Sequence, residues 1–117
     1  MKNLIAFFEI PVTYFYQSVN FYQTILGVEL MVAEYNNEKM ACFVQDGQTV
    51  GTISYAPNFK PSEHGVLIHF NCEDIDRSIR QVMKQHSYPK TKIQADGKWY
   101  FAVFADPAGN HIGLYTD

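Results

Sequence analysis

The sequence predicts an α+β fold in which a βαβββ unit occurs twice within one domain. Three observations support this prediction. The chain has 117 residues, a length that suits one domain. Hydrophobic residues make up 47% of the chain and include nine Phe and eight Tyr, enough to build a core. The order of strand-like and helix-like patterns also runs through the chain twice, with one linker-like stretch between the two runs.

The first copy begins with a buried strand followed by a helix. Residues 4–12 are apolar throughout except for Glu9, and Pro11 closes the strand. The helix is expected to have Thr13 as its N-cap and Gly27 as its C-cap. Its apolar side chains recur at helical spacing, at Phe15, Val19, Tyr22 and Ile25 or Leu26. Strands are expected next at residues 28–34, 40–44 and 49–55, with Gln-Asp-Gly-Gln as a hairpin signal between the last two.

The second copy follows a linker at residues 56–65, APNFKPSEHG, which holds two prolines and a glycine. A strand is expected at residues 66–72 and a helix at residues 74–86. A short strand lies before residue 99, and further strands cover residues 99–105 and 111–115. The helix places one apolar face along Ile75, Ile79, Val82 and Met83. Residues 1–117 are therefore expected to form one domain of two modules, about 1–55 and 66–117.

The two copies can also be matched directly. VTYFYQSV at 12–19 aligns with CEDIDRSI at 72–79, a shift of 60 residues. MACFVQDGQTVG at 40–51 aligns with FAVFADPAGNHIG at 101–113 with one additional residue in the second copy. This alignment matches Gly51 to Gly113. The matches occur in the same order in both copies and agree in element type, which indicates an internal repeat.

Composition excludes several classes of protein. The net charge is −3 and Lys and Arg form no run, so no nucleic-acid partner is expected. No stretch approaches the length of a membrane span, and the N-terminal apolar run is too short for a signal peptide, so a cytoplasmic protein without a membrane partner is expected. Cys42 and Cys72 form no CxxC pair and are expected to be small core residues. The acidic balance slightly favours a cationic ligand.

Two stretches carry a resemblance to a known family. FFEIPVTYFYQSVNFYQTILG at 7–27 and DPAGNHIGLY at 106–115, together with the paired βαβββ modules, resemble the vicinal oxygen chelate superfamily. It is also called the glyoxalase, bleomycin resistance protein and extradiol dioxygenase superfamily. The resemblance covers essentially the whole chain. It implies two sheets that form an incomplete barrel around a cavity, a homodimer and, in the enzymes, a divalent metal in the cavity.

The resemblance also marks the positions of the metal ligands. In the metal-dependent members, ligands come from the first and last strands of each module. Carried over by motif, these positions are Phe7, Leu67, Gly113 and, by the repeat, Gly51. None of these side chains has a donor atom, whereas zinc, iron or manganese requires His, Cys or carboxylate ligands. We therefore expect no cofactor at the usual site, and neither ordinary glyoxalase I nor extradiol dioxygenase activity.

Strand alternation predicts which side chains face the cavity. One set, expected to pack on the helices, is Ala6, Phe8, Ile10, Val66, Ile68, Phe70, Ile112 and Leu114. The other set, expected to face a ligand, is Phe7, Glu9, Leu67, His69, Asn71, His111, Gly113 and Tyr115. Trp99 and Tyr100 are further candidates for an aromatic pocket, with a place in the core as the alternative. His111 is either a wall of the cavity or a half-exposed residue after a turn.

Glu9 and His69 are repeat counterparts, and both are expected to face the cavity. A carboxylate and an imidazole within reach of each other can act as a general acid/base couple. The alternative is a polar pair that fixes how the modules meet, with no catalytic part.

Three functions follow. The first is binding of a small-molecule ligand in the cavity or in a dimer groove, without proven catalysis. The second is a metal-independent lyase or isomerase that uses Glu9 and His69. The third is a metal-dependent lyase or dioxygenase with a displaced divalent site made by Glu9, His69 and His111.

Overall fold

The computed structural model of the chain describes residues 2–89, 91–95 and 99–117, and the side chains of residues 91–95 and 99 lie outside this description. The elements follow the predicted βαβββ order twice. Their bounds are β1 Phe8–Pro11, α1 Phe15–Leu26, β2 Met31–Tyr35, β3 Glu38–Gln45, β4 Gln48–Tyr55, β5 Ile68–Asn71, α2 Ile75–Lys84, β6 Thr91–Ala95, β7 Trp99–Ala105 and β8 His111–Thr116.

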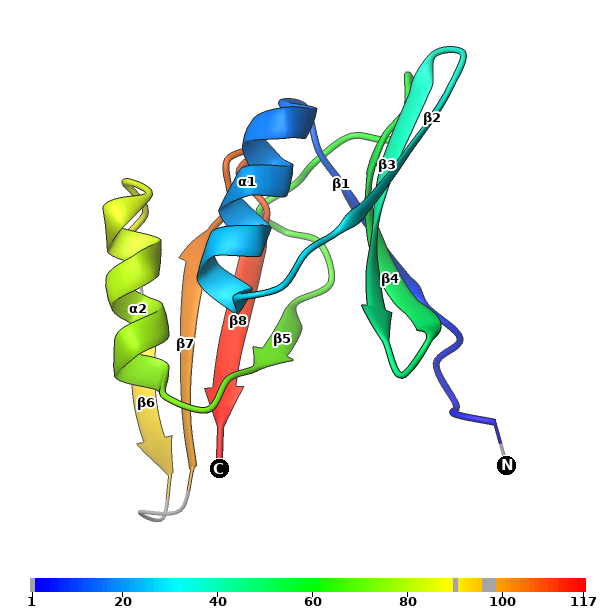
Figure 1. Cartoon of the computed structure of the whole chain (residues 1–117). Coiled ribbons are helices and arrows are strands. Elements are labelled where there is room, and N and C mark those ends of the chain that lie inside the picture. The colour runs from blue at the N-terminus through cyan, green and yellow to red at the C-terminus, as the bar shows by residue number, and fades with distance from the viewer. Residues whose placement is uncertain (1, 90, 96–98) are drawn as a thin grey trace.

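The strands form two open sheets with the same topology. Their orders are β1-β4-β3-β2 and β5-β8-β7-β6, and the first strand of each sheet pairs in parallel with the last. The α+β fold with two sheet modules is therefore confirmed. Figure 1 shows α1 between the two sheets and α2 against the second sheet beside β6 and β7.

Several predicted element ends were inaccurate. The first strands begin later than expected, at Phe8 and Ile68. The N-cap of α1 is Tyr14 rather than Thr13, and no side chain caps this end. Gly27 is confirmed as the C-cap of α1, with a left-handed φ of 66°. This conformation favours glycine because it has no Cβ to clash.

The strand registers correct the predicted match of Gly51 to Gly113. Glu9 pairs with Thr52 in the first sheet, as His69 pairs with Gly113 in the second. The repeat counterpart of Gly113 is therefore Thr52. The first module has a register shift between Phe43 and Val44. With this shift, the two modules align without the additional residue that the sequence alignment had placed in the second module. Such β-bulges cannot be recognised reliably in one sequence.

The core joins the two modules through aromatic side chains of α1. The Tyr22 ring lies 5.7 Å from Phe43 of β3 and 6.0 Å from Phe70 of β5, measured between ring centroids. Phe21 lies 5.9 Å from Phe104 of β7. Because both α1 residues are almost fully buried, α1 belongs to the core of both modules.

A buried hydrogen-bond network, which we call the inter-module junction, adds to this contact. The Tyr22 hydroxyl donates to Asp106 at 2.6 Å, and the Asn110 side-chain amide donates to the Pro11 carbonyl at 2.7 Å. Asp106 also accepts from the Asn110 backbone N–H at 2.9 Å. Burial, and then the charge of Asp106, raises the pKa of Tyr22 well above its usual value. The DPAGN stretch is therefore both a turn and the junction between the modules.

Candidate functional site

Each sheet has one face toward the helices and one open face. In the first sheet, the register aligns Met31, Cys42, Thr52 and Glu9 in one row on the open face. In the second sheet, the corresponding row holds Val103, Gly113 and His69. The equivalent rows define the same surface in both modules, and that is where sequence alternation placed the candidate site.

The predicted orientation of the strands is largely confirmed. Six residues of the set assigned to the helices lie in the core or pack against it: Phe8, Ile10, Ile68, Phe70, Ile112 and Leu114. The assignment of Ala6 and Val66 was wrong, because both precede the strands and are exposed. Alternation holds only where the chain is already extended and paired.

Glu9 and His69 lie at equivalent positions on the open faces. Both residues are exposed. Among residues 2–89, 91–95 and 99–117, no hydrogen bond or ion pair joins the two side chains. The His69 ring instead lies 5.7 Å from the Phe101 ring in an edge-to-face arrangement. Their action as an acid/base couple stays a prediction.

The two glycines at predicted metal positions, Gly51 and Gly113, are explained by close packing. The Phe8 ring lies over Gly51, and the His69 ring lies over Gly113, so a Cβ at either position would collide with a ring. Thr52, the true counterpart of Gly113, is 5% exposed, and its hydroxyl shares a 2.8 Å hydrogen bond with Ser54. Phe7 and Leu67 precede β1 and β5 and are 54% and 41% exposed.

The aromatic candidates divide between the two faces. Tyr100 is partly buried and packs against the core, which was the alternative to a place in an aromatic pocket. Phe101, which the sequence analysis missed, lies on the open face beside His69. The alternation of the buried Ala102 and Phe104 could have identified it. The side chain of Trp99 lies outside the described residues. Tyr115 is half-buried and pairs with the exposed Asn71 in the second sheet.

A cavity of about 290 Å³, which we call the linker pocket, lies where the linker crosses β1 and β8. It brings together Glu9 and His111, two of the predicted site residues, with an apolar wall that includes Ile68. Phe59, Lys60 and Ser62 of the linker also line it. His111 Nε2 lies 3.9 Å from the Glu63 carboxylate, an ion pair when the imidazole is protonated. The pocket therefore has an apolar wall with carboxylates and an imidazole near it.

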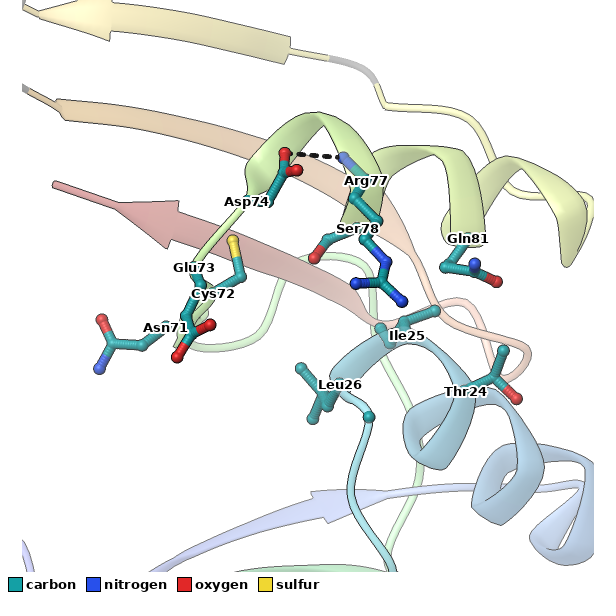
Figure 2. Close-up of a pocket in the computed structure, with 11 residues that line it drawn as sticks. Thr24, Ile25, Leu26, Asn71, Cys72, Glu73, Asp74, Arg77, Ser78 and Gln81 are labelled. Atoms are coloured by element: carbon teal, nitrogen blue, oxygen red, sulfur yellow. Dashed lines mark hydrogen bonds between the residues drawn. The ribbon is translucent and has the colours of Figure 1, made fainter.

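A larger cavity of about 560 Å³, the interhelix cleft, lies between the end of α1 and the start of α2 (Figure 2). No pattern in the sequence predicts this cleft, because two helix ends far apart in the chain form it. Cys72 lies in its wall, and its thiol donates to the Tyr115 carbonyl at 3.5 Å. Burial raises the pKa of this thiol, so Cys72 stays protonated at neutral pH.

The described part of the chain contains no group of three His, Cys, Asp or Glu side chains that is arranged to hold a metal ion. Glu9, His69 and His111 are therefore not assembled into the displaced site that was considered above. Among the helices of the described residues, none is long and apolar enough to cross a membrane.

Comparison with known proteins agrees with this fold. Residues 4–114 match the model of the Glyoxalase/Bleomycin resistance protein/Dioxygenase superfamily. No curated protein matches the sequence. A glyoxylase/bleomycin resistance protein/dioxygenase domain from Frankia sp. EAN1pec has a TM-score of 0.77 at 13% identity, and the match covers 99% of this chain and 93% of that chain.

Two further solved structures have more specific names. The fosfomycin resistance protein FosX from Listeria monocytogenes has a TM-score of 0.75 at 15% identity, covering 100% of this chain and 93% of that chain. TnmS3, an antibiotic binding protein from Streptomyces sp. CB03234, has a TM-score of 0.70 at 19% identity, covering 98% and 96%. At these identities the likeness shows the shared fold.

Proposed function

The chain belongs to the Glyoxalase/Bleomycin resistance protein/Dioxygenase superfamily, and within it we propose a protein that binds a small, preferably cationic, aromatic molecule without a metal ion. The ligand would lie on the open faces of the sheets and extend toward the linker pocket. A cytoplasmic homodimer, in which a second copy encloses the open faces, completes this proposal.

The observation that carries the proposal is the chemistry of the family's metal positions. Phe7, Leu67 and Gly113 have no donor atoms, and the register replaces Gly51 by Thr52, whose hydroxyl is already shared with Ser54. Zinc and the divalent ions of oxygenases require imidazole, thiolate or carboxylate ligands. The residues therefore do not fit the usual metal, and the proposal includes no step through one.

The surroundings of the open faces support the preference for a cationic aromatic ligand. Phe7, two residues before Glu9, is exposed, as is Met31 at the opposite edge of the same row, and Phe101 lies beside His69. Aromatic rings and thioethers give contact area to flat ligands. Glu63 lies close to the linker pocket, and the net charge of −3 adds a weak attraction for cations. One structurally similar protein is named as antibiotic binding.

Calorimetry with metal-free bleomycin, a cationic aromatic antibiotic, and with fosfomycin, an anionic one, tests this proposal in the presence of EDTA. We expect saturable heat with bleomycin and none with fosfomycin. Glu9→Gln should weaken binding about two- to fivefold, as expected for an exposed charge, while Glu38→Gln on the far hairpin should not. Absence of heat with bleomycin up to high micromolar concentration, or equal binding of both antibiotics, would contradict the proposal.

The equivalent, exposed positions of Glu9 and His69 favour a second candidate, a metal-independent lyase or isomerase. In it, His69 would move a proton of a bound carbonyl or hydroxy compound, and Glu9 would hold the imidazole. A screen of such compounds with the wild type, Glu9→Gln and His69→Ala tests it. Turnover that persists in both variants, with folding unchanged, would remove the pair from any mechanism.

A further inference from the structure

The interhelix cleft joins two helix ends of opposite polarity. Thr24, Ile25, Leu26 and Gly27 at the end of α1 form one wall. The other wall is the segment from Asn71 through the first turns of α2, with Arg77, Ser78 and Gln81. At about 560 Å³, the cleft is within the range of small-molecule sites, roughly 300–1,000 Å³. Of the residues expected to face a ligand, Asn71 also lines this cleft, and the cleft does not depend on the function proposed above.

Two charged groups in the cleft have no partner of opposite charge among the described residues. Figure 2 shows the Arg77 guanidinium extending from α2 toward α1, and Glu73 on the loop before α2. Within the described residues, neither the guanidinium nor the Glu73 carboxylate has a hydrogen bond or an ion pair. Asp74 is already engaged, because its carboxylate caps α2 by accepting from the Arg77 backbone N–H at 3.1 Å. A cation and an anion are thus available in the same cavity.

The end of α1 adds a second negative element. The Gly27 and Val28 N–H groups both donate to the Gln23 carbonyl. In the described part of the chain, no backbone N–H therefore reaches the carbonyls of Thr24, Ile25 or Leu26. Open carbonyls at a helix C-terminus carry partial negative charge and attract cations. An ammonium group in the cleft would meet these carbonyls in addition to Glu73.

The wall also has an apolar part. Ile25 is only 4% exposed, so the partly buried Leu26 provides the apolar surface on the side of the cleft formed by α1. The Ser78 hydroxyl and the Gln81 amide lie on the α2 side. A ligand that satisfies all these groups carries one carboxylate, one ammonium and an aliphatic portion.

We propose that the interhelix cleft is a binding site for a small zwitterion, an α-amino acid with a branched apolar side chain. Its carboxylate binds the Arg77 guanidinium, which offers paired N–H donors. Its ammonium binds Glu73 and the open carbonyls of α1. Its side chain packs on Leu26. Each charged contact is charge-assisted, so losing either one weakens binding about tenfold or more.

The probe is L-leucine, with two truncated analogues as controls. 4-Methylpentanoate lacks the ammonium group and 3-methylbutylamine lacks the carboxylate. Backbone amide shifts of Gly27, Arg77 and Ser78 are followed by NMR during titration of the full chain. We expect saturable shifts with L-leucine, centred on these residues, and binding about tenfold or more weaker for each analogue.

Two matched variants complete the test. Arg77→Gln should weaken L-leucine binding about tenfold, whereas Arg80→Gln, on the same helix but outside the cleft, should leave it unchanged. Glu73→Gln should weaken it as well, and Glu38→Gln should not. The proposal is overturned if L-leucine gives no saturable shifts, if an analogue binds as well as L-leucine, or if Arg80→Gln weakens binding as much as Arg77→Gln.

Discussion

The two modules share one topology but keep their helices in place by different means. Six residues of α1 are buried, but only Ile75 and Val82 of α2 are. In contrast, α2 has a capping side chain, an acidic residue in its first turn and a basic residue in its last, while α1 has none of these. Local charges and caps stabilise a helix on its own, whereas tertiary packing replaces them in a buried helix. The helices of the two repeats have therefore diverged: α1 is buried in the core, and α2 lies at its periphery.

The largest contrast is expected between Phe21 and its counterpart 60 residues later, Gln81. Phe21 is 2% exposed and contacts Phe104 of the other module. Phe21→Ala should lower the free energy of unfolding by about 3–5 kcal/mol. Gln81→Ala, in the wall of the interhelix cleft, should change it by about 0.5 kcal/mol or less. Urea denaturation of both variants measures this contrast, and similar losses would contradict the distinct roles of the helices.

The next contrast lies in the turns before the last strands. Asp106 is buried and accepts hydrogen bonds from Tyr22 and from the Asn110 backbone. Its counterpart in the first module, Gln45, is exposed. Asp106→Ala should destabilise by about 3 kcal/mol, since it leaves buried donors unpaired, and Gln45→Ala by less than about 0.5 kcal/mol. If thermal denaturation shows both to be neutral, the inter-module junction does not couple the modules.

The same junction predicts a loss of stability at alkaline pH. The pKa of Tyr22 is raised in the folded state, mainly by burial, so the folded protein holds this proton more tightly than the unfolded chain. Its contribution is complete below the ordinary tyrosine value and is lost as pH rises from there toward the raised pKa. Tyr22→Phe should flatten the fall in unfolding free energy above about pH 10. An unchanged alkaline slope would contradict this role of Tyr22.

A smaller effect distinguishes the glycines of the last strands. Gly113→Ala should cost about 1–3 kcal/mol because the new methyl group meets the His69 ring. The second change His69→Ala should restore most of this loss, because His69 is exposed. In the first module, Gly51→Ala meets Phe8, and Phe8→Ala should add a loss of its own, because Phe8 packs on Phe43 and Phe70. Rescue in both modules, or in neither, would contradict the packing described.

The smallest contrast concerns the two N-caps, Asp74 and its counterpart Tyr14. Asp74→Ala should destabilise by about 1 kcal/mol through loss of the cap. Tyr14 is 62% exposed and its side chain caps nothing, so Tyr14→Ala should be close to neutral. Thermal unfolding of both variants provides the measurement, and a larger loss for Tyr14→Ala would reverse the assignment.

Much of the fold was predictable because the chain repeats its patterns and buries one face of each strand. The alternation around Ile10, Ile68 and Ile112 identified the core face correctly, since all three lie in the core or pack against it. Whether Gly51 or Thr52 is the counterpart of Gly113 was not predictable, because no sequence pattern indicates the register shift beside Val44.

The candidate site was predictable in part. Sequence alternation placed Glu9 and His69 on the open faces, yet it does not give the distance between two sheets. The linker pocket brings Glu9 together with His111 rather than with His69. The interhelix cleft had no sequence signal, since Arg77 and Leu26 meet only through the packing of α1 beside α2.

The proposed function requires both modules to present their open faces to one ligand without a metal ion. Titration of the protein with metal-free bleomycin, with and without EDTA, tests it most directly through the amide NMR shifts of Glu9, Thr52, His69 and Gly113. We predict saturable shifts at these four amides from both modules, with an affinity that EDTA leaves unchanged. Shifts confined to the helices, or binding that EDTA abolishes, would contradict metal-free binding on the open faces.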